Sequence, residues 1–523
     1  MILRNTYKRS RLLGMAFIVF MLAAAFPVRQ THAQDVTFVI HSFNIQGNTV
    51  LSKDILTAAV LKFAGKGKTA QDVELARDAL EKVYHKSGYP TVLVNIPEQT
   101  VDDGIVRFQV IEGRIKRVFV KGNKYFTMEN IKEQLPAIQE GNLLYLPQVR
   151  EELSKINRNP DLKVSPVLIP GKELGKIDVE LNVEDALPLH GELELNNRST
   201  HTTTDTRLNA MIRYDNLWQK RHSINAQFQT APQKTDEVMV FSSSYSMPAP
   251  WNHEHLMIGY FINSDSETAS GVGFNVIGKG RIFGFRYMTP LPSQGHYDHN
   301  LILGFDWKDF EEDTLGGEFL PNEYVPVSFG YASYYSGSKS LTQFSADLNM
   351  IFRDLFMNDT DEFRNKRAGA TGNYIYLRAG MEHRHQLPKD FSFFIKIDGQ
   401  LSDQPMINNE QYAAGGVDSV RGYKESELLE DNAIHTTVEL FSPDLLKKNQ
   451  LRPYLFYDCA WLGRREAGFE EDARKFIQSI GVGLTGNWKE TITYKLDWGY
   501  ALKDTDATRS GDQELHFKIK YQF

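Results

Sequence analysis

The chain has little of several features that mark common classes of protein. Its 523 residues include one cysteine, Cys459, so no disulfide can form within the chain. An oxidising compartment is therefore neither required nor excluded. Lysine and arginine together number 59 against 66 aspartates and glutamates, a formal net charge of −7. The absence of a basic excess argues against a nucleic-acid-binding protein.

Long apolar runs are also scarce. Residues 12–26 form the one continuously apolar stretch, and it is shorter than the roughly 20 residues that a membrane-spanning helix needs. Basic residues precede it and Thr31-His32-Ala33 follows it, a pattern typical of a secretory signal peptide. We therefore expect residues 1–33 to be removed by cleavage after Ala33; the alternative is an uncleaved anchor. A mature protein without such a helix can span a membrane only as a closed barrel.

Sequence patterns of catalysis and of cofactor binding are missing as well. The chain contains no HExxH and no GxSxG motif, and Gly278-Lys279-Gly280 lacks the rest of a phosphate loop. His253 and His255, like His383 and His385, are spaced to share one face of a strand, but no further ligand follows at a recognisable distance. These histidines are better interpreted as polar loop and strand-end residues. We expect no enzyme activity, no catalytic residue, no metal and no cofactor.

The most informative feature that is present is the alternation of the last ten residues, 514–523. Because side chains of a strand alternate between two faces, this segment has one apolar face and one polar face. The apolar face consists of Leu515, Phe517, Ile519, Tyr521 and Phe523. The polar face consists of Glu514, His516, Lys518, Lys520 and Gln522. A soluble sheet buries its apolar face on a core, whereas a membrane barrel turns that face to lipid and its charged face to a wet lumen.

The same alternation recurs throughout residues 189–523 in segments of about ten residues, which fit a tilted membrane-spanning strand. Clear cases are found at 375–381, 434–440 and 491–500. Short proline-bearing turns at 247–250, 289–292 and 387–389 are interspersed with longer polar stretches at 264–271 and 309–325. Outer-membrane barrels combine short and long connections in this way. At roughly 20 residues per strand with its loop, the region predicts about sixteen antiparallel strands. A β-sandwich is the soluble alternative; the blade repeat of a propeller is not found.

A repeat precedes this region, in residues 36–186. Each of its two units opens with a strand that ends in Gly-Asn, at Gly47-Asn48 and at Gly122-Asn123. Two helices and two strands follow in each unit, so the predicted order is β-α-α-β-β, twice. Thr69 and Asp72 form a capping box for a helix of the first unit, and Pro147 suits the first turn of a helix in the second.

This order, the Gly-Asn after the first strand and Ile111-Glu112-Gly113 at the end of the first unit resemble POTRA domains. We place a first POTRA domain at 36–113 and a second at 114–186. A small mixed sheet with an open edge can accept a strand from an extended client, which favours a docking function. The alternative is a rigid spacer.

A glycine-rich segment within the predicted barrel carries a lone arginine, in the sequence GGVDSVRGY at 415–423. Three glycines near Arg421 indicate a tight loop that orients the single arginine side chain. Downstream, Tyr454, Phe456 and Asp458 share one face of a predicted strand, so that Asp458 can face the lumen and pair with Arg421. Spacing alone leaves an ordinary loop arginine and an ordinary strand aspartate equally open.

A second resemblance bears on this choice. Val420-Arg421-Gly422-Tyr423 is similar to the VRGY signature of the barrel superfamily that holds two-partner secretion transporters and outer-membrane assembly factors. The segment from Phe456 to Asp458 is similar to the F-x-D element of that superfamily. The resemblance implies that the motif tips a loop folded back into the lumen, where Arg421 meets Asp458 on the barrel wall. It also implies that Gly422 permits a close backbone approach and that Tyr423 packs beside the pair.

Taken together, the chain most resembles TpsB transporters of the haemolysin secretion/activation type. This implies α+β POTRA domains in the periplasm, followed by a transmembrane antiparallel β-barrel at 189–523 in the bacterial outer membrane. Its implied partners are an unfolded secreted exoprotein, which is exported without ATP, outer-membrane lipid, and the barrel-assembly machinery. The apolar face at 515–523 is then expected to be the C-terminal assembly signal. No nucleic acid is expected as a partner.

Two other functions share parts of this architecture. An outer-membrane assembly factor, or insertase, has the same plan, but such relatives resemble chains with three or more POTRA units. If the protein were a simple diffusion pore, the VRGY element would have no role. Many TpsB transporters also carry a plug helix before the first POTRA domain. Here the strand-like residues 36–40 follow the predicted cleavage site so closely that no room remains, and closure of the pore is expected to rest on the folded-in loop.

Overall fold

A computed structural model describes residues 36–101, 103–266, 268–271, 274–313, 319–352, 360–448, 450–466, 472–489 and 491–523. The predicted signal peptide lies outside these residues. The chain forms two compact units. The first unit comprises residues up to 119 together with 137–152 and 167–180, and the second comprises 120–136, 153–166 and 181–523.

The first repeat, residues 36–113, is a small α+β structure. Its elements are β1 (Phe38–Ile40), β2 (Ser42–Gln46), α1 (Lys53–Val60), η1 (Leu61–Phe63), β3 (Gly65–Lys68), α2 (Ala70–Lys86), β4 (Val92–Asn95) and β5 (Ile105–Glu112). Strand β5 lies between β2, which is parallel to it, and β4, which is antiparallel. The predicted capping box of Thr69 and Asp72 at the start of α2 is confirmed. One side of α2 buries Leu80 and Tyr84 in the core that it shares with this sheet.

The predicted order for this repeat was incomplete, because β1 and β3 form an additional two-stranded sheet. The sequence of β3, Gly-Lys-Gly-Lys, has no apolar side chain and therefore no alternation that could predict a strand. The second repeat contains β6 (Arg114–Lys121), α3 (Met128–Glu133), α4 (Leu146–Ile156), β7 (Leu162–Pro170) and β8 (Lys176–Asp185), with sheet order β6-β8-β7. None of the helices that the structure describes is both long and apolar enough to cross a membrane.

The Gly-Asn pair of each repeat occupies a position that requires glycine. Gly47 has φ +83°, and a Cβ on it would lie 2.3 Å from the carbonyl oxygen of Val110. Gly122 has φ +92°, and its Cβ would lie 2.4 Å from the carbonyl oxygen of Val183. A side chain would therefore face both a left-handed backbone and a collision with the last strand of its repeat.

The asparagine that follows each glycine closes the same turn in both repeats. Asn48 Nδ2 donates to the carbonyl oxygen of Leu51 at 2.7 Å, and Asn123 Nδ2 donates to that of Phe126 at 2.8 Å. After Asn123, three successive backbone N–H groups donate to Asp185 at 2.7 to 2.9 Å. Burial raises the pKa of the Asp185 carboxyl, but these donors more than offset it and hold the pKa below its ordinary value.

Replacement of Gly47 by alanine is expected to destabilise the first repeat strongly. The left-handed backbone costs about 1–3 kcal/mol for a residue with a Cβ, and the contact with Val110 adds to this. The measurement is the urea midpoint for proteolysis of the N-terminal region in the full chain in detergent. Gly67→Ala is the matched control, because Gly67 has φ +68° but no atom within 4 Å of its Cβ position. Equal shifts for the two variants would contradict the steric argument.

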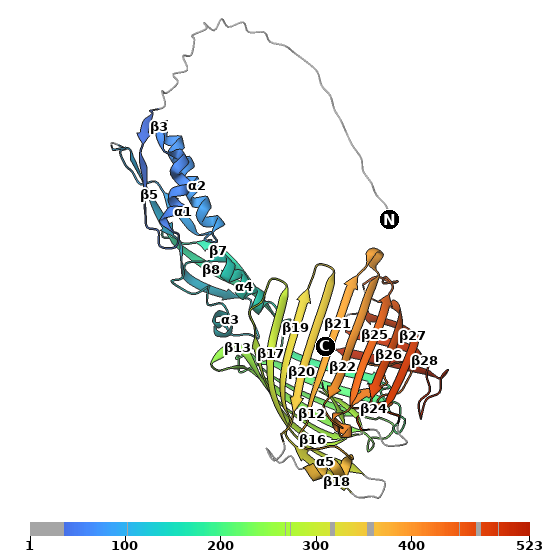
Figure 1. Cartoon of the computed structure of the whole chain (residues 1–523). Helices are drawn as coiled ribbons and strands as arrows, with labels where there is room; N and C mark the ends of the chain where they lie inside the picture. Colours follow the sequence, from blue (N-terminus) through green and yellow to red (C-terminus); the bar gives the residue numbers. More distant parts are fainter. Residues whose placement is uncertain are drawn as a thin grey trace, which may run out of the picture. The chain divides into compact units, whose positions relative to one another are not determined.

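The C-terminal region forms a closed antiparallel barrel of sixteen strands, which confirms the predicted fold class (Figure 1). The strands are β9 (Leu189–Asn196), β10 (Arg207–Leu217), β11 (His222–Thr230), β12 (Met239–Ala249), β13 (Asn252–Asp265), β16 (Lys279–Pro290), β17 (Tyr297–Asp313), β19 (Val327–Ser336), β20 (Ser340–Met350), β21 (Ile375–Gln386), β22 (Ser392–Ser402), β25 (Asn432–Phe441), β26 (Arg452–Gly463), β27 (Arg474–Trp488), β28 (Ile492–Ala501) and β29 (Gln513–Gln522). Strand β29 pairs with β9 and closes the ring.

Smaller elements lie between these strands. They are β14 (Thr268–Gly271), β15 (Phe274–Ile277), β18 (Phe319–Tyr324), α5 (Thr360–Lys366), η2 (Pro388–Asp390), η3 (Asn408–Glu410), β23 (Tyr412–Ala414) and β24 (Leu428–Glu430). The interpretation of 309–325 as a polar loop was wrong in part, because β17 runs on to Asp313 and β18 pairs with it. Backbone pairing between β17 and β18 makes this segment a strand hairpin, and such pairing does not require an apolar alternation.

The wall has an apolar outer face and a polar inner face. On β29, Leu515, Ile519, Tyr521 and Phe523 are 44–63% exposed, and Phe517 is half-buried. His516, between two of these positions, is 3% exposed. An apolar surface of this extent is stable when hydrocarbon rather than water covers it.

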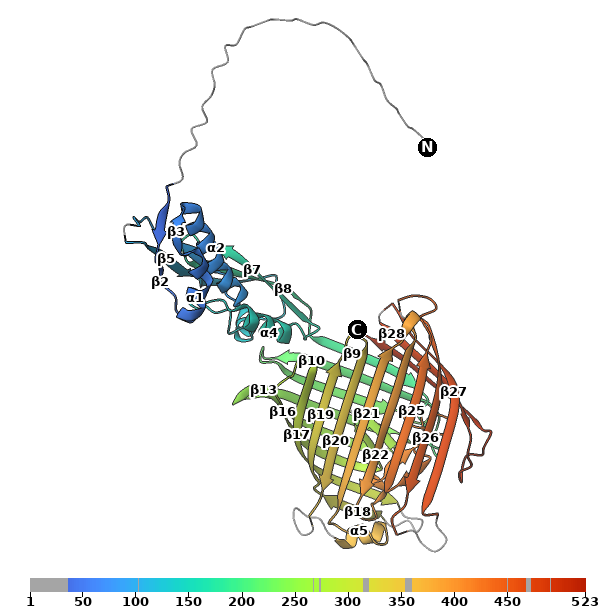
Figure 2. The same cartoon turned by 45° about the horizontal axis from the view of Figure 1, so that its top comes forward.

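The two ends of the barrel differ in their connections. Short turns join the strands at the end where β9 begins and β29 ends, here called the short-turn end, and longer segments join them at the long-loop end. Helix α5 and β18 lie together at the long-loop end (Figure 2). At the short-turn end, Asn130 Nδ2 donates to the carbonyl oxygen of Gln219 at 2.6 Å, and Lys155 pairs with Glu254 at 2.7 Å.

Candidate functional site

A long segment between β22 and β25, residues 403–431, folds into the barrel and is here called the lumen loop. It contains β23 and β24, which pair with each other. Its tip is closed by a hydrogen bond from the backbone N–H of Gly416 to the carbonyl oxygen of Tyr423 at 3.1 Å. The tip carries Arg421, which is 1% exposed.

Arg421 is bound on several sides by groups of the barrel wall. Its Nε donates to Asp458 Oδ2 at 2.8 Å, and its Nη2 donates to Asp458 Oδ1 at 2.7 Å. The backbone N–H of Arg421 also donates to Asp458, at 3.1 Å. The guanidinium carbon lies 3.6 Å from the centre of the Phe456 ring, a cation–π contact. The structure thus brings the predicted loop residue and both predicted wall residues together in a bidentate, desolvated pair.

Two further carboxylates of this site were missed by sequence reasoning. Glu439 Oε1 accepts from Arg421 Nη1 at 2.6 Å, and Asp497 Oδ1 lies 3.8 Å from the same nitrogen. Lys495 Nζ is 3.2 Å from Asp497. The strand alternation marks Glu439 as inward-facing, but its position opposite Phe456 depends on the pairing of β25 with β26. Three buried carboxylates therefore face two cations.

The other residues of the VRGY motif seat the tip against the wall. A Cβ on Gly422 would lie 2.8 Å from the Cβ of Ser479, so only glycine permits this approach. The Tyr423 hydroxyl donates to the carbonyl oxygen of Lys503 at 2.9 Å and accepts from its N–H at 3.2 Å. Val420 is fully buried in an apolar cluster of the loop tip and the wall.

Gly422→Ala is expected to unseat the loop tip. Its new methyl group would collide with Ser479 and with the backbone nitrogen of Ala501, 2.9 Å away, both of which belong to packed wall strands. The measurement is tryptic cleavage after Arg421 in the folded protein in detergent, identified by mass spectrometry. The wild type should resist cleavage, because Arg421 is buried, and the variant should be cut.

Gly463→Ala is the matched control for this measurement. A Cβ on Gly463, also at the barrel wall, would have its nearest neighbour at 3.8 Å, an ordinary van der Waals contact. Cleavage after Arg421 in the control, or resistance in Gly422→Ala, would show that close packing at Gly422 does not hold the tip.

A second buried cluster holds the base of the lumen loop, and no sequence pattern marks it. Glu410 is 1% exposed and accepts from Lys308 Nζ at 2.5 Å. It also accepts from the hydroxyls of Tyr324 and Tyr376, each at 2.7 Å. Arg378 Nη2 donates to the backbone carbonyl of Glu410 at 3.2 Å. These partners come from β17, β18 and β21, so the loop base is tied to two wall strands and to the small strand β18.

The last part of the lumen loop is held in a similar way. Asp431 is fully buried and forms an ion pair with Arg367, whose Nη2 lies 2.7 Å from Asp431 Oδ2. The backbone N–H groups of Met406 and Arg465 donate to the Asp431 carboxylate at 2.9 and 2.7 Å. Asp431 therefore links three connecting segments of the long-loop end.

An aromatic cluster surrounds the loop base at the long-loop end. Phe363 of α5 contacts Tyr324 and Tyr374, with ring centres 5.3 and 6.2 Å apart. Met406 and Ile407 of the lumen loop are buried in the same cluster. The cluster and the ion pairs together hold the loop base inside the barrel.

The two histidine pairs set aside in the sequence lie on the wall strands β13 and β21. His255 Nδ1 is 2.5 Å from the Tyr287 hydroxyl, and His383 Nδ1 is 2.8 Å from Thr342 Oγ1. Cross-strand hydroxyl groups are therefore partners of His255 and His383, and the ring of His385 stacks on that of His383. Among the described residues, the one group of three metal-ligating side chains lies elsewhere, at Asp161, His190 and Asp215.

Comparisons with known proteins agree with this arrangement. Residues 175–486 match the family model for the haemolysin secretion/activation protein ShlB/FhaC/HecB, and residues 38–113 match the ShlB-type POTRA domain. The outer membrane transporter CdiB of Dickeya dadantii (strain 3937) is 22% identical over 76% of this chain and 71% of its own. The heme/hemopexin transporter protein HuxB of Haemophilus influenzae is 21% identical over 89% of this chain and 84% of its own.

Solved structures share the fold. CdiB from Escherichia coli superposes with a TM-score of 0.68 at 17% identity, covering 95% of this chain and 93% of that one. BamA from Haemophilus ducreyi lacking POTRA domains 1–3 gives 0.56 at 14% identity, covering 93% and 100%. Since the first family model spans more than half of the sequence, the chain belongs to the ShlB/FhaC/HecB family of haemolysin secretion/activation proteins, outer-membrane transporters of two-partner secretion whose POTRA region lies in the periplasm.

Proposed function

We propose that this transporter captures an unfolded exoprotein in the periplasm and exports it through the barrel without ATP, as in type Vb secretion. Capture is assigned to two POTRA domains, at 36–113 and 114–186. The second assignment is supported by the shared sheet order, in which the last strand lies between the other two, and by the repeated glycine turn.

The edges of these two sheets are the proposed docking surfaces. Strands β2 and β4 are the outer strands of one sheet, and β6 and β7 are those of the other. An extended client that adds to such an edge gains main-chain hydrogen bonds with little demand on its sequence. This mode suits a client that arrives unfolded and moves through the transporter by successive segments.

The observation that carries export is the lumen loop. It occupies the barrel interior, and the ties described above are hydrogen bonds, ion pairs and apolar contacts, which are all reversible. A barrel of sixteen strands whose loop has moved aside encloses an aqueous channel. In this proposal the ion pair of Arg421 and Asp458 holds the lumen loop in its resting position. The Phe456 ring packs against the Arg421 guanidinium. Gly422 and Tyr423 position the loop tip against the wall. Export is driven by the folding of the client outside the cell, which makes its return through the barrel unfavourable.

Delivery of the transporter itself needs two signals. Residues 1–33 are proposed as the signal peptide for export to the periplasm. The outward face of β29, ending in Phe523, is proposed as the signal that the barrel-assembly machinery reads. Support comes from its exposed apolar side chains at the end of the last strand, where the backbone N–H of Phe523 pairs with the carbonyl oxygen of Gly191 at 3.1 Å.

Deletion of the gene tests this function against the insertase alternative. Mass spectrometry would compare the medium, the cell surface and the outer membrane of the deletion strain with those of the parent. A dedicated exporter predicts that one exoprotein disappears from the surface and the medium while other barrels keep their levels. A fall in many outer-membrane barrels would identify an assembly factor instead, and unchanged profiles would remove the export proposal.

A further inference from the structure

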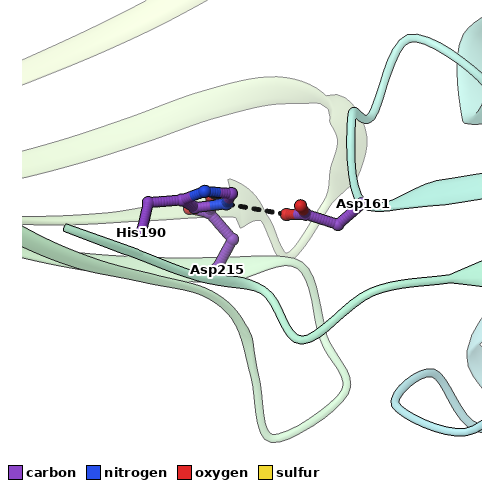
Figure 3. Close-up of side chains that lie close together, drawn as sticks. All are labelled: Asp161, His190 and Asp215. Carbon is purple, nitrogen blue, oxygen red and sulfur yellow. Dashed lines mark hydrogen bonds and ion pairs between the residues drawn. The ribbon is translucent and has the colours of Figure 1, made fainter. Parts of the chain in front are cut away.

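Three side chains with metal-ligating atoms converge at the short-turn end of the barrel (Figure 3). Asp161 precedes β7, whereas His190 and Asp215 lie on the adjacent strands β9 and β10. His190 Nε2 is 2.8 Å from Asp161 Oδ2 and 3.5 Å from Asp215 Oδ2. All three ligand atoms lie within 4.8 Å of one another. No metal is expected from the sequence, and these three residues are far apart in the chain and follow no recognisable ligand spacing.

Asp161 is held in place by its own backbone. It is 6% exposed, its N–H donates to Asn159 Oδ1 at 2.9 Å, and its carbonyl oxygen accepts from the N–H of Ala186 at 2.9 Å. Segment 153–166 belongs to the same compact unit as the barrel. The carboxylate of Asp161 is therefore presented to His190 from a fixed turn.

Asp215 is oriented by neighbours on the same sheet. Ser223 Oγ donates to its Oδ1 at 2.5 Å, and Arg213 Nε donates to its Oδ2 at 3.0 Å. The backbone N–H of Asp215 donates to the carbonyl oxygen of Pro188 at 2.8 Å. Outer contacts of this kind orient the first ligands of metal sites. Arg213 takes one lone pair of Oδ2, and that oxygen retains another for a cation.

The two spacings measured from His190 Nε2 suit a four-coordinate ion. Tetrahedral zinc, with bonds to nitrogen and oxygen of about 2.0–2.2 Å, separates neighbouring ligand atoms by roughly 3.4 Å. The two distances from His190 lie on either side of this value. Two carboxylates, one guanidinium and a neutral imidazole leave one uncompensated negative charge, which favours a divalent cation. The simpler alternative is a histidine hydrogen-bonded to one aspartate beside a second, with no metal.

We propose that Asp161, His190 and Asp215 bind a divalent transition-metal ion, with zinc as the best match to one imidazole and two carboxylates. A water molecule completes the fourth position. Neutral His190 would coordinate the ion through Nε2 with its proton on Nδ1, and because protons compete with the ion for all three ligands, binding weakens in acid. It ties the turn at Asp161 to the first two strands of the barrel. This inference does not depend on the export proposal.

The test is zinc binding by the purified full-length protein in detergent. After EDTA treatment and desalting, titration calorimetry with zinc chloride and elemental analysis of the dialysed protein should give one zinc ion per chain in the wild type. His190→Gln and Asp161→Asn should lose this zinc. His255→Gln is the matched control, since His255 is another wall histidine at the short-turn end, and it should retain the stoichiometry.

Heat-modifiable migration in electrophoresis reports whether each variant still forms its barrel. If His190→Gln does not fold, Asp215→Asn, which keeps the shape of the side chain, provides the same comparison. Two results would overturn the proposal. One is a wild type that binds no zinc, which leaves a plain hydrogen-bonded histidine, and the other is zinc that folded variants retain at the wild-type level.

Discussion

Arg421→Ala is expected to reduce export severely while the barrel still assembles in the outer membrane. The variant leaves Asp458, Glu439 and Asp497 buried with Lys495 as the remaining cation of this site. Loss of one partner of a buried ion pair costs about 3–5 kcal/mol, whereas an exposed pair contributes about 0–1 kcal/mol. The side chains of Arg421 and Asp458 are 2% and 0% exposed, so the larger figure applies.

The expected consequence is a lumen loop without a defined position. Its tip then moves within the barrel and obstructs the path of the client, instead of alternating between a seated and a released state. The measurement is the amount of the exoprotein, identified by the gene deletion, that reaches the medium or the surface. Heat-modifiable migration of the transporter in outer-membrane fractions reports barrel formation.

Two further variants test whether the loss of export comes from the unpaired buried charges. Arg421→Ala combined with Asp458→Asn removes a buried negative charge as well as the cation, and should recover part of the stability that Arg421→Ala loses. Arg281→Ala, which truncates an exposed arginine on wall strand β16, should export normally. Normal export by Arg421→Ala would remove the loop from the mechanism.

Glu410→Gln is expected to open the resting pore. The neutral amide cannot compensate the charge of Lys308, whose side chain is largely buried, and it accepts weaker hydrogen bonds from Tyr324 and Tyr376. The base of the lumen loop should then detach from the wall. Planar-bilayer recordings should detect a higher open probability than in the wild type, and cells should become sensitive to antibiotics too large for ordinary porins.

A matched control separates this effect from a general change in charge. Glu311, an exposed residue of the same strand as Lys308, can be replaced by glutamine without loss of a buried pair. Glu311→Gln should conduct like the wild type. If Glu410→Gln also conducts like the wild type, the ion pair of Glu410 with Lys308 has no part in closing the pore, and the aromatic cluster and the ion pair of Asp431 with Arg367 hold the loop base.

The sequence predicted most of the fold because its signals are local. The alternation in 514–523 is a property of neighbouring residues, and the structure turns Leu515 outward and His516 inward as that alternation requires. The capping box at Thr69 is local too. Strand β3 was not predicted, because Gly-Lys-Gly-Lys has no pattern that distinguishes a strand from a loop.

Of the candidate site, only the residues that belong to a recognisable motif were predicted from the sequence. The pairing of Arg421 with Asp458 followed from resemblance, since the two residues are far apart in sequence and no spacing rule connects them. Glu439 and Asp497 stand beside Arg421 because β25 to β28 are neighbours in a closed wall. Glu410 is a single glutamate in a loop, and nothing around it marks it as buried.

Periods of two and of 3.6 residues can be recognised within short stretches of the sequence, and they are sufficient to predict small α+β repeats followed by a barrel with an apolar exterior. The three-dimensional fold was needed to find the carboxylates around Arg421, the pairing of Lys308 with Glu410, and the grouping of Asp161, His190 and Asp215. The reason is physical: closing the barrel places side chains from distant strands within a few ångströms, and register between strands is not encoded within any one of them.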